Sequence, residues 1–187
     1  MNYQSIAIAG LPGSGKTTLG KKLSEATGWD YFPIGQLFRR RHELIFKNGD
    51  TKKPFEDWWA QEVTNADIIA INREAHERLA YGEKILDSRY AVENARHVSH
   101  TLLVFVKAPL IVRAQRAFDS GEYKERGITT LEKTIEFLDQ REKDEARRGQ
   151  EIFKYDYRNE KLYDLILDTN MLSLEDEVEL ITDFITS

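Results

Sequence analysis

Cysteine is absent from the 187 residues of this chain, and proline, methionine and tryptophan are scarce. Without cysteine the chain can form neither a disulfide nor a thiolate metal site, which fits a reducing compartment. Long apolar runs are also missing, because even the longest, such as Leu102 to Val106, are far shorter than a membrane span. The sequence does not open with a basic and then apolar signal pattern. We therefore expect a cytoplasmic protein with no membrane partner.

The chain also lacks an excess of positive charge. It has 27 Lys and Arg residues against 32 Asp and Glu residues, a net charge of −5. Nucleic acids are bound mainly through surplus Lys and Arg, so this balance argues against general nucleic-acid binding. Arginines occur in local clusters instead, which suit one small polyanion as ligand. These clusters are Arg39 to Arg41, Arg113 with Arg116, and Arg141 with Arg147 and Arg148.

Glycine is concentrated in one stretch, Gly10 to Thr17, which has the sequence GLPGSGKT and matches the phosphate-loop pattern G-x-x-x-x-G-K-[ST]. In such a loop the backbone N–H groups and the start of the next helix together form an anion-binding concavity. Lys16 is expected to contact the β and γ phosphates, and the Thr17 hydroxyl suits an octahedral Mg²⁺ shell. The predicted ATP-binding residues are Gly10, Gly13, Ser14, Gly15, Lys16, Thr17 and Thr18.

The length predicts one domain, residues 1–187, with enough apolar residues for one core. Short apolar runs alternate with helical patterns, which predicts an α/β fold: a three-layer sandwich of about five parallel strands with helices on both faces. Ligands bind at the carboxyl ends of such strands, so the phosphate loop, Asp87, Lys107 and Asp168 should share one rim. The expected strands are Ser5 to Ala9, the region of Tyr31 and Phe32, Lys84 to Asp87, Thr101 to Val106, and Leu165 to Asp168.

Two segments fall outside the alternating pattern. Residues 34–81 contain a long, mostly helical insertion from Pro54 to Tyr81, and residues 117–157 contain a highly charged helix. We expect both to act as flaps on the scaffold. Large aromatic residues in the first of them are expected to be core. The final helix, to Ile185, opens with a capping signal formed by Ser173 and Asp176.

Further stretches of the chain also have a recognisable order and spacing. They are Ile8 to Thr18, Ile34 to Arg39, Ile85 to Arg89, Val106 to Leu110, Val112 to Arg116, Arg141 to Arg148, and Tyr163 to Thr169. Through these stretches the sequence resembles the nucleoside monophosphate kinases, and most of all the archaeal-type cytidylate kinases, almost from end to end. The chain departs from that family's pattern at Lys154, where the pattern has glycine, and in the expected base pocket. The departures in the base pocket are Pro33, Ile34, Gln36 and Ser88.

The resemblance implies transfer of the ATP γ-phosphoryl group, with Mg²⁺, to the phosphate of CMP or dCMP. An ionised acceptor phosphate needs no general base, so the four histidines (His42, His76, His97 and His100) are expected to be structural or exposed. The resemblance implies catalytic roles for Lys16, Arg89, Arg116, Arg141 and Arg148, acceptor binding by Gly35, Arg39, Asp87, Arg89 and Asp144, and metal binding by Thr17 and, through water, Asp87. Residues 34–81 would cover the acceptor and residues 117–157 would form a lid.

Helical spacing supports part of this assignment, because Arg141, Asp144, Glu145 and Arg148 recur at i, i+3, i+4 and i+7 and should share one helix face. Two other functions stay open. The chain could be a kinase of the same scaffold for a nucleoside, dephospho-coenzyme A or another metabolite, in which case Asp87 could serve as a base. It could instead be a nucleotide-dependent interaction protein with weak ATPase activity. We expect a monomer whose partners are ATP and a small phosphorylated acceptor.

Overall fold

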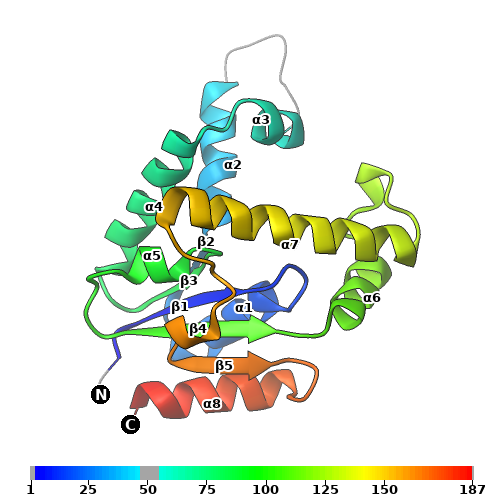
Figure 1. The fold of residues 1–187 in the computed structure, drawn as a ribbon. Coiled ribbons are helices and arrows are strands. Elements are labelled where there is room, and N and C mark those ends of the chain that lie inside the picture. Colours follow the sequence, from blue (N-terminus) through cyan, green and yellow to red (C-terminus); the bar gives the residue numbers. More distant parts are fainter. Residues whose placement is uncertain (1–2, 47–54, 187) are drawn as a thin grey trace.

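The computed structural model describes residues 3–46 and 55–186 (Figure 1). In this part of the chain five parallel strands form one sheet in the order β2-β3-β1-β4-β5. The predicted α/β fold with a five-stranded parallel sheet is confirmed. The strands are β1 (Ser5–Gly10), β2 (Asp30–Pro33), β3 (Lys84–Asp87), β4 (Thr101–Lys107) and β5 (Leu165–Asp168).

Helices cover both faces of the sheet. On one face, α1 and α8 pack against the sheet through apolar residues such as Leu19 and Ile181. On the other face lie α2 to α5 and the long helix α7, which passes over the sheet from α6 towards α4 and α5 (Figure 1). The helices are α1 (Lys16–Thr27), α2 (Ile34–Ile45), α3 (Phe55–Gln61), α4 (Asn65–Leu79), α5 (Ala91–Ala95), α6 (Leu110–Ser120), α7 (Leu131–Phe153) and α8 (Leu174–Thr186), with 3₁₀ turns at Lys124–Arg126 and Glu160–Leu162.

Alternation along the central strand divides the core into two layers. Ile6 and Ile8 of β1 point to the face covered by α1 and α8, whereas Ala7 and Ala9 point to the opposite face. All four side chains are fully buried, as expected for the middle strand of a parallel sheet that is covered on both sides. A third apolar cluster joins α6 to the first half of α7. This cluster fixes the first part of α7 against α6.

The two predicted flaps correspond to helical segments. Residues 34–81 contain α2, α3 and α4, while residues 117–157 contain the end of α6 and all of α7; Pro54 lies outside the described residues. Their roles as acceptor flap and lid stay predictions. The Ser173 hydroxyl donates to Asp176 Oδ2 at 2.6 Å and accepts from its N–H at 3.1 Å, which confirms the cap of α8. Among the described residues, no helix combines the length and the apolar character needed to cross a bilayer.

Lys154 ends α7 in the left-handed conformation, with φ 65° and ψ 24°. Cβ sterics make this region unfavourable for residues other than glycine, which explains why the family pattern has glycine at this position. The exposed Lys154 side chain donates to the carbonyl oxygen of Glu151 at 2.9 Å. That bond satisfies one carbonyl group of the last helical turn but leaves the backbone strain in place.

Replacing Lys154 by glycine should stabilise the protein, because glycine adopts this φ without the steric cost of a Cβ. We expect the free energy of unfolding to rise by about 1 kcal/mol, which is about 2–4 °C in Tm for a chain of this size. Lys154→Ala is the matched control, since it removes the side-chain bond but keeps the Cβ. Chemical denaturation of both variants checks the prediction, and a glycine variant no more stable than the alanine variant would contradict it.

Candidate active site

The phosphate loop is held tightly against the neighbouring strand. A Cβ added at Gly10 would lie 2.2 Å from the carbonyl oxygen of Val106 on β4, so no other residue fits there without moving the strand. Gly15 has φ 100° and precedes the first residue of α1. Both glycines are therefore required by the backbone, one for close approach and the other for the turn into the helix. The loop follows β1 and precedes α1, as the sequence predicts.

Lys16 lies buried inside this loop. Its Nζ donates to the carbonyl oxygens of Gly10 and Leu11, both at 3.1 Å. Burial lowers the pKa of Lys16 to about 8, although the nearby carboxylate of Asp87 acts in the opposite direction. The ammonium group is thus paired with backbone oxygens of the loop, which are weaker partners than phosphate oxygens would be.

Thr17 and Asp87 meet at the carboxyl ends of neighbouring strands. Asp87 ends β3 and is aligned with Ile8 of β1, which places its carboxylate beside the loop. Its Oδ2 accepts from the Thr17 hydroxyl at 3.0 Å and from the Tyr31 hydroxyl at 3.2 Å. A hydroxyl and a carboxylate in contact are hard oxygen donors of the type that Mg²⁺ prefers, with water completing the shell. The donor set therefore fits the metal that the sequence predicts here.

A cavity of about 270 Å³ opens beside the loop, lined by residues 13–18 together with Arg116, Ala117, Ser120 and Glu122. Arg116 is held at its edge by Thr169, where it donates to the hydroxyl at 2.7 Å and to the carbonyl oxygen at 2.8 Å. The Thr169 hydroxyl in turn donates to the carbonyl oxygen of Ser14. The structure thus places Arg116 beside the phosphate loop and the end of β5.

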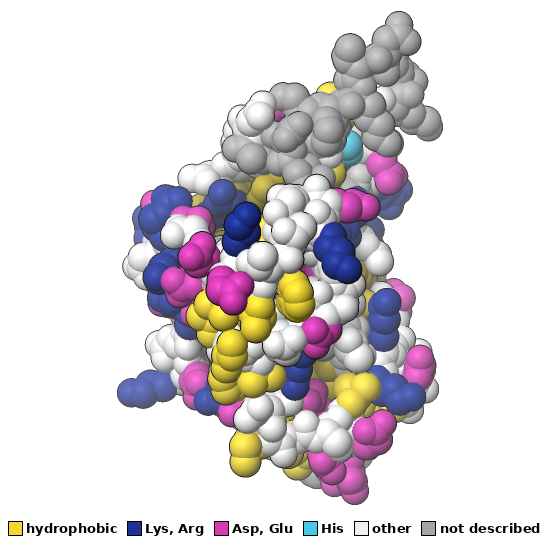
Figure 2. All heavy atoms as spheres, turned by 90° about the vertical axis from the view of Figure 1, so that its right-hand side faces the viewer, with side chains coloured by type: hydrophobic (Ala, Val, Ile, Leu, Met, Phe, Trp, Pro, Cys, Tyr) yellow, Lys and Arg dark blue, Asp and Glu magenta, His cyan; other side chains and the backbone are white. Residues whose placement is uncertain are grey.

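Figure 2 shows the face of the molecule on which α6 lies, the right-hand side of Figure 1. Lys and Arg side chains are interspersed there with Asp and Glu, and acidic side chains gather at the foot of the view. The first turn of α8 carries the exposed Glu175 and Asp176, while the third acidic residue there, Glu177, is buried. On this face the positive charge forms no continuous basic surface.

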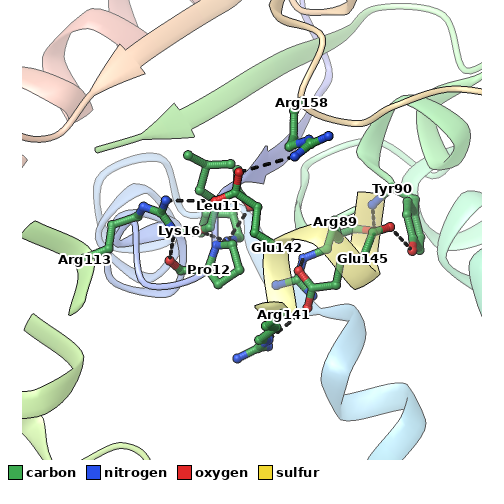
Figure 3. Close-up of polar contacts among 12 residues, drawn as sticks. Leu11, Pro12, Lys16, Arg89, Tyr90, Arg113, Arg141, Glu142, Glu145 and Arg158 are labelled. Atoms are coloured by element: carbon green, nitrogen blue, oxygen red, sulfur yellow. Dashed lines mark hydrogen bonds and ion pairs between the residues drawn. The ribbon is translucent and has the colours of Figure 1, made fainter. Parts of the chain in front are cut away.

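Arg89 and Arg141 are brought together by Glu145 (Figure 3). Arg89 follows β3, and its Nε lies 2.6 Å from Glu145 Oε2. Arg141 lies one turn before Glu145 on α7, and its Nε donates to Glu145 Oε1 at 2.9 Å. Arg141 also donates to the Tyr123 hydroxyl at 2.9 Å. The helix spacing placed Glu145 on this face, but sequence reasoning gave it no role.

Arg113 has a role that the sequence analysis missed. Although grouped there with Arg116 as part of a cluster for a polyanion, Arg113 is buried and paired with protein groups (Figure 3). It donates to the carbonyl oxygens of Ala108 and Pro12, both at 2.9 Å, and to Glu142 Oε2 at 2.8 Å. Arg113 therefore ties the phosphate loop to the end of β4 and to α7. No local sequence signal distinguishes it from Arg116, because the partner carboxylate lies 29 residues away.

Arg39 and Arg148 rest on one pair of aromatic rings. The Arg39 guanidinium carbon is 5.7 Å from the ring centroid of Phe55, and that of Arg148 is 5.8 Å from the ring of Trp59. The two rings are stacked at 6.2 Å. Gly35, in the first turn of α2, lies beside Arg39: a Cβ there would be 3.9 Å from Arg39 Nη1, an ordinary van der Waals distance. These contacts join α2, α3 and α7 through cation–π pairs.

Asp144 lies apart from the inward-facing residues of α7. Its side chain is 51% exposed, and its nearest ion-pair partner is Arg147 at 3.9 Å, which is also exposed. Arg141 and Glu145 are less exposed, at 34% and 16%, and Arg148 contacts Trp59. Of the four residues expected on one helix face, Asp144 is therefore the one that lies at the exposed edge.

Ser88, one of the departures from the family pattern, is part of a buried polar network. Its hydroxyl donates to Asn94 Oδ1 at 2.6 Å, and Asn94 Nδ2 donates to the carbonyl and side-chain oxygens of Asn72 on α4. His76 contacts the Asn94 carbonyl oxygen, which agrees with a structural role. The network fixes the backbone that carries Arg89. Of the other histidines, His42 is buried among aromatic rings, and His97 and His100 are exposed.

Comparisons with known proteins agree with this arrangement. The model of the cytidylate kinase-like family matches residues 5–171. A protein named cytidylate kinase from Methanopyrus kandleri is 36% identical over 92% of this chain and 87% of its own length, and one from Methanosarcina barkeri is 32% identical over 88% and 86%.

Solved structures support the fold. A shikimate kinase from Bacteroides thetaiotaomicron has a TM-score of 0.65 at 14% identity, covering 98% of this chain and 99% of its own. An uncharacterized protein from Eubacterium ventriosum has a TM-score of 0.69 at 13% identity, with the same coverage. At such low identity these likenesses establish the P-loop kinase fold alone. The family match and the two relatives, which span most of the chain, establish that it belongs to the cytidylate kinase-like family.

Proposed function

We propose that this chain transfers the γ-phosphoryl group of ATP to the phosphate of CMP, with dCMP as a second acceptor. The observation that carries the proposal is the convergence of Arg89 and Arg141 beside a phosphate loop whose Lys16 is buried. Membership of the family and the names of the relatives support the choice of acceptor. Phosphoryl transfer requires cations placed around the moving group, and this site supplies them from three separate elements.

The donor half of the reaction belongs to the phosphate loop. Residues 13–18 would enclose the triphosphate, Lys16 would exchange its loop carbonyls for phosphate oxygens, and Arg116 would line the ATP cavity. Thr17 and Asp87 would hold Mg²⁺, directly and through water. When bound, this ion would neutralise charge on the β and γ phosphates.

The acceptor half belongs to arginines, with no general base. Arg39 and Gly35 on α2 would receive the acceptor phosphate, with Arg89 as its partner on the strand side. Arg141 and Arg148 would contact the transferring group from α7. Asp87 already contacts Thr17 and Tyr31 through one oxygen, which suits metal binding better than proton abstraction from an alcohol. By covering this side of the site, α7 would exclude water and favour transfer over hydrolysis.

The proposal predicts which acceptors stimulate ADP release. Purified protein with ATP and Mg²⁺ should release ADP rapidly with CMP, and with dCMP as well, but slowly with cytidine, shikimate or dephospho-coenzyme A. The reason is that each of these three compounds would accept through a hydroxyl group, so none presents a terminal phosphate monoester to the arginines. A coupled assay over this panel, with water as the blank, makes the measurement. Stimulation by an alcohol alone would overturn the proposal, and release equal to the blank with every acceptor would indicate an ATPase.

Arg39 should act on acceptor binding rather than on ATP binding. We expect Arg39→Ala to raise KM for CMP on the order of 10- to 100-fold, because a charge-assisted bond to phosphate contributes about 1.5–3 kcal/mol. The KM for ATP should change less than about twofold on the same scale. Arg40→Ala is the matched control, since Arg40 is the adjacent exposed arginine. Equal effects of the two substitutions would contradict the assignment.

ATP affinity should depend on pH through Lys16. Its pKa is about 8 in this structure, and only the protonated ammonium can pair with phosphate oxygens. Affinity should therefore fall by about half between pH 7 and 8 and by up to about tenfold at pH 9, as the proton is lost. Calorimetry at pH 8.5 in buffers of different ionisation enthalpy should show proton uptake on binding. A constant affinity from pH 7 to 9.5 without proton uptake would count against this role.

A further inference from the structure

Glu145 occupies the centre of the candidate site between two guanidinium groups from different elements. Arg89 extends from the loop after β3, and Arg141 comes from the preceding turn of α7. One oxygen of the carboxylate faces each arginine, at 2.6 and 2.9 Å. The Glu145 side chain is 16% exposed, so the charge is shielded from water. A carboxylate that bridges two guanidiniums has the charge and spacing of two oxygens of a phosphoryl group.

The pairing leaves hydrogen-bonding capacity unused. Arg89 Nε and Glu145 Oε2 are close but misaligned, and both are among the buried polar atoms without a hydrogen bond. Within the described residues five buried side-chain atoms make no hydrogen bond. One of the other three is the Tyr157 hydroxyl, on which the charges of Arg89 and Glu145 also act. Proteins rarely leave buried polar atoms without partners. Arg89 Nε and Glu145 Oε2 form an ion pair without a hydrogen bond, so both keep hydrogen-bonding capacity that a further polar group could use.

Charge balance at the site also requires Glu145 when no substrate is bound. The ammonium of Lys16 feels the positive charges of Arg89 and Arg141, and Glu145 is the carboxylate in contact with both arginines. A transferring phosphoryl group would bring its own negative charge to these cations. It would also repel the carboxylate, which would then lose its partners. Substrate and Glu145 therefore compete for the same arginines.

Contacts hold the α7 backbone at Glu145 in place. A movement of the Glu145 side chain alone can therefore free the arginines for substrate. The Tyr90 hydroxyl donates to the Glu145 carbonyl oxygen at 3.1 Å (Figure 3). One turn later, Gly149 packs so closely that a Cβ would lie 3.0 Å from the Tyr90 ring. These two contacts dock α7 on the loop that carries Arg89. A change of side-chain rotamer can release the arginines while the helix stays in place.

We propose that Glu145 is a positioning residue that takes the place of phosphoryl oxygens between Arg89 and Arg141 until substrate displaces it. This inference rests on the proposed function and adds to it an internal competitor for phosphate. The carboxylate keeps both arginines oriented in the absence of substrate, at a cost in affinity for the incoming anion. Its removal should therefore strengthen anion binding, whereas removal of a purely structural residue would weaken it.

Glu145→Gln tests the competition directly, with inorganic phosphate and CMP as probes in calorimetry. We expect the variant to bind each probe about tenfold more tightly than wild type, and kcat to fall because the arginines lose their orientation in the empty site. Glu151→Gln is the matched control: it removes the same charge from the same helix, at an exposed position paired with Arg147. It should change neither affinity more than twofold. Equal or weaker phosphate binding by Glu145→Gln would overturn the inference.

Glu145→Asp distinguishes two ways in which Glu145 could weaken phosphate binding: by occupying the space between the arginines, or by its negative charge alone. This variant keeps the negative charge but is one methylene too short to reach both arginines. Competition by occupancy predicts phosphate affinity between those of wild type and Glu145→Gln, whereas a field effect predicts wild-type affinity and would overturn the inference. The measurement does not require turnover. If wild type fails to transfer phosphate to CMP while the two variants still rank as expected, the proposed function fails and the competition stands.

Discussion

Repulsion among the cations at the carboxyl ends of β1 and β3 is the constraint on which the rest of the site depends. Lys16 follows β1 through the phosphate loop, Arg89 follows the neighbouring strand β3, and Arg141 reaches the same place from α7. Each is at least half buried, where like charges repel more strongly than in water. The chain compensates them with its own groups: backbone carbonyls for Lys16 and the carboxylate of Glu145 for the two arginines.

A second ion pair, between Arg113 and Glu142, holds the phosphate loop and α7 together at the same edge of the sheet. The phosphate loop can bind a triphosphate only if its backbone keeps its shape, yet α7 must meet the loop closely enough to exclude water. Arg113 meets both needs, because one guanidinium group donates to the Pro12 carbonyl and to Glu142 on α7. Glu142 also lies 3.6 Å from Arg158, beyond the end of the helix. The middle of α7 is thus attached to the loop, and any closing motion would have to carry this attachment with it.

The sequence predicted the scaffold well because its signals are local. The apolar runs, the glycine spacing of residues 10–15 and the cap at Ser173 all act within a few residues, and each appears in the structure. The arrangement of arginines could not be read in the same way. Arg113 and Arg116 are three residues apart on one helix, but one meets a carboxylate on α7 and the other a threonine after β5. Their roles are decided by contacts across 29 and 53 residues, which no local pattern records.

The difference between local sequence signals and contacts made in the folded chain also affects what can be said about base selection. Ser88 differs from the family's glycine, yet its hydroxyl is committed to Asn94 and so offers little to a substrate base. The stacked rings of Phe55 and Trp59 lie instead beneath Arg39 and Arg148, the arginines assigned to the two ends of the reaction. Polar recognition discriminates bases strongly, whereas aromatic contact tolerates any base. An acceptor flap that relies on these rings would hold the monophosphate chiefly by its phosphate, and the arginines would then govern affinity more than the base does.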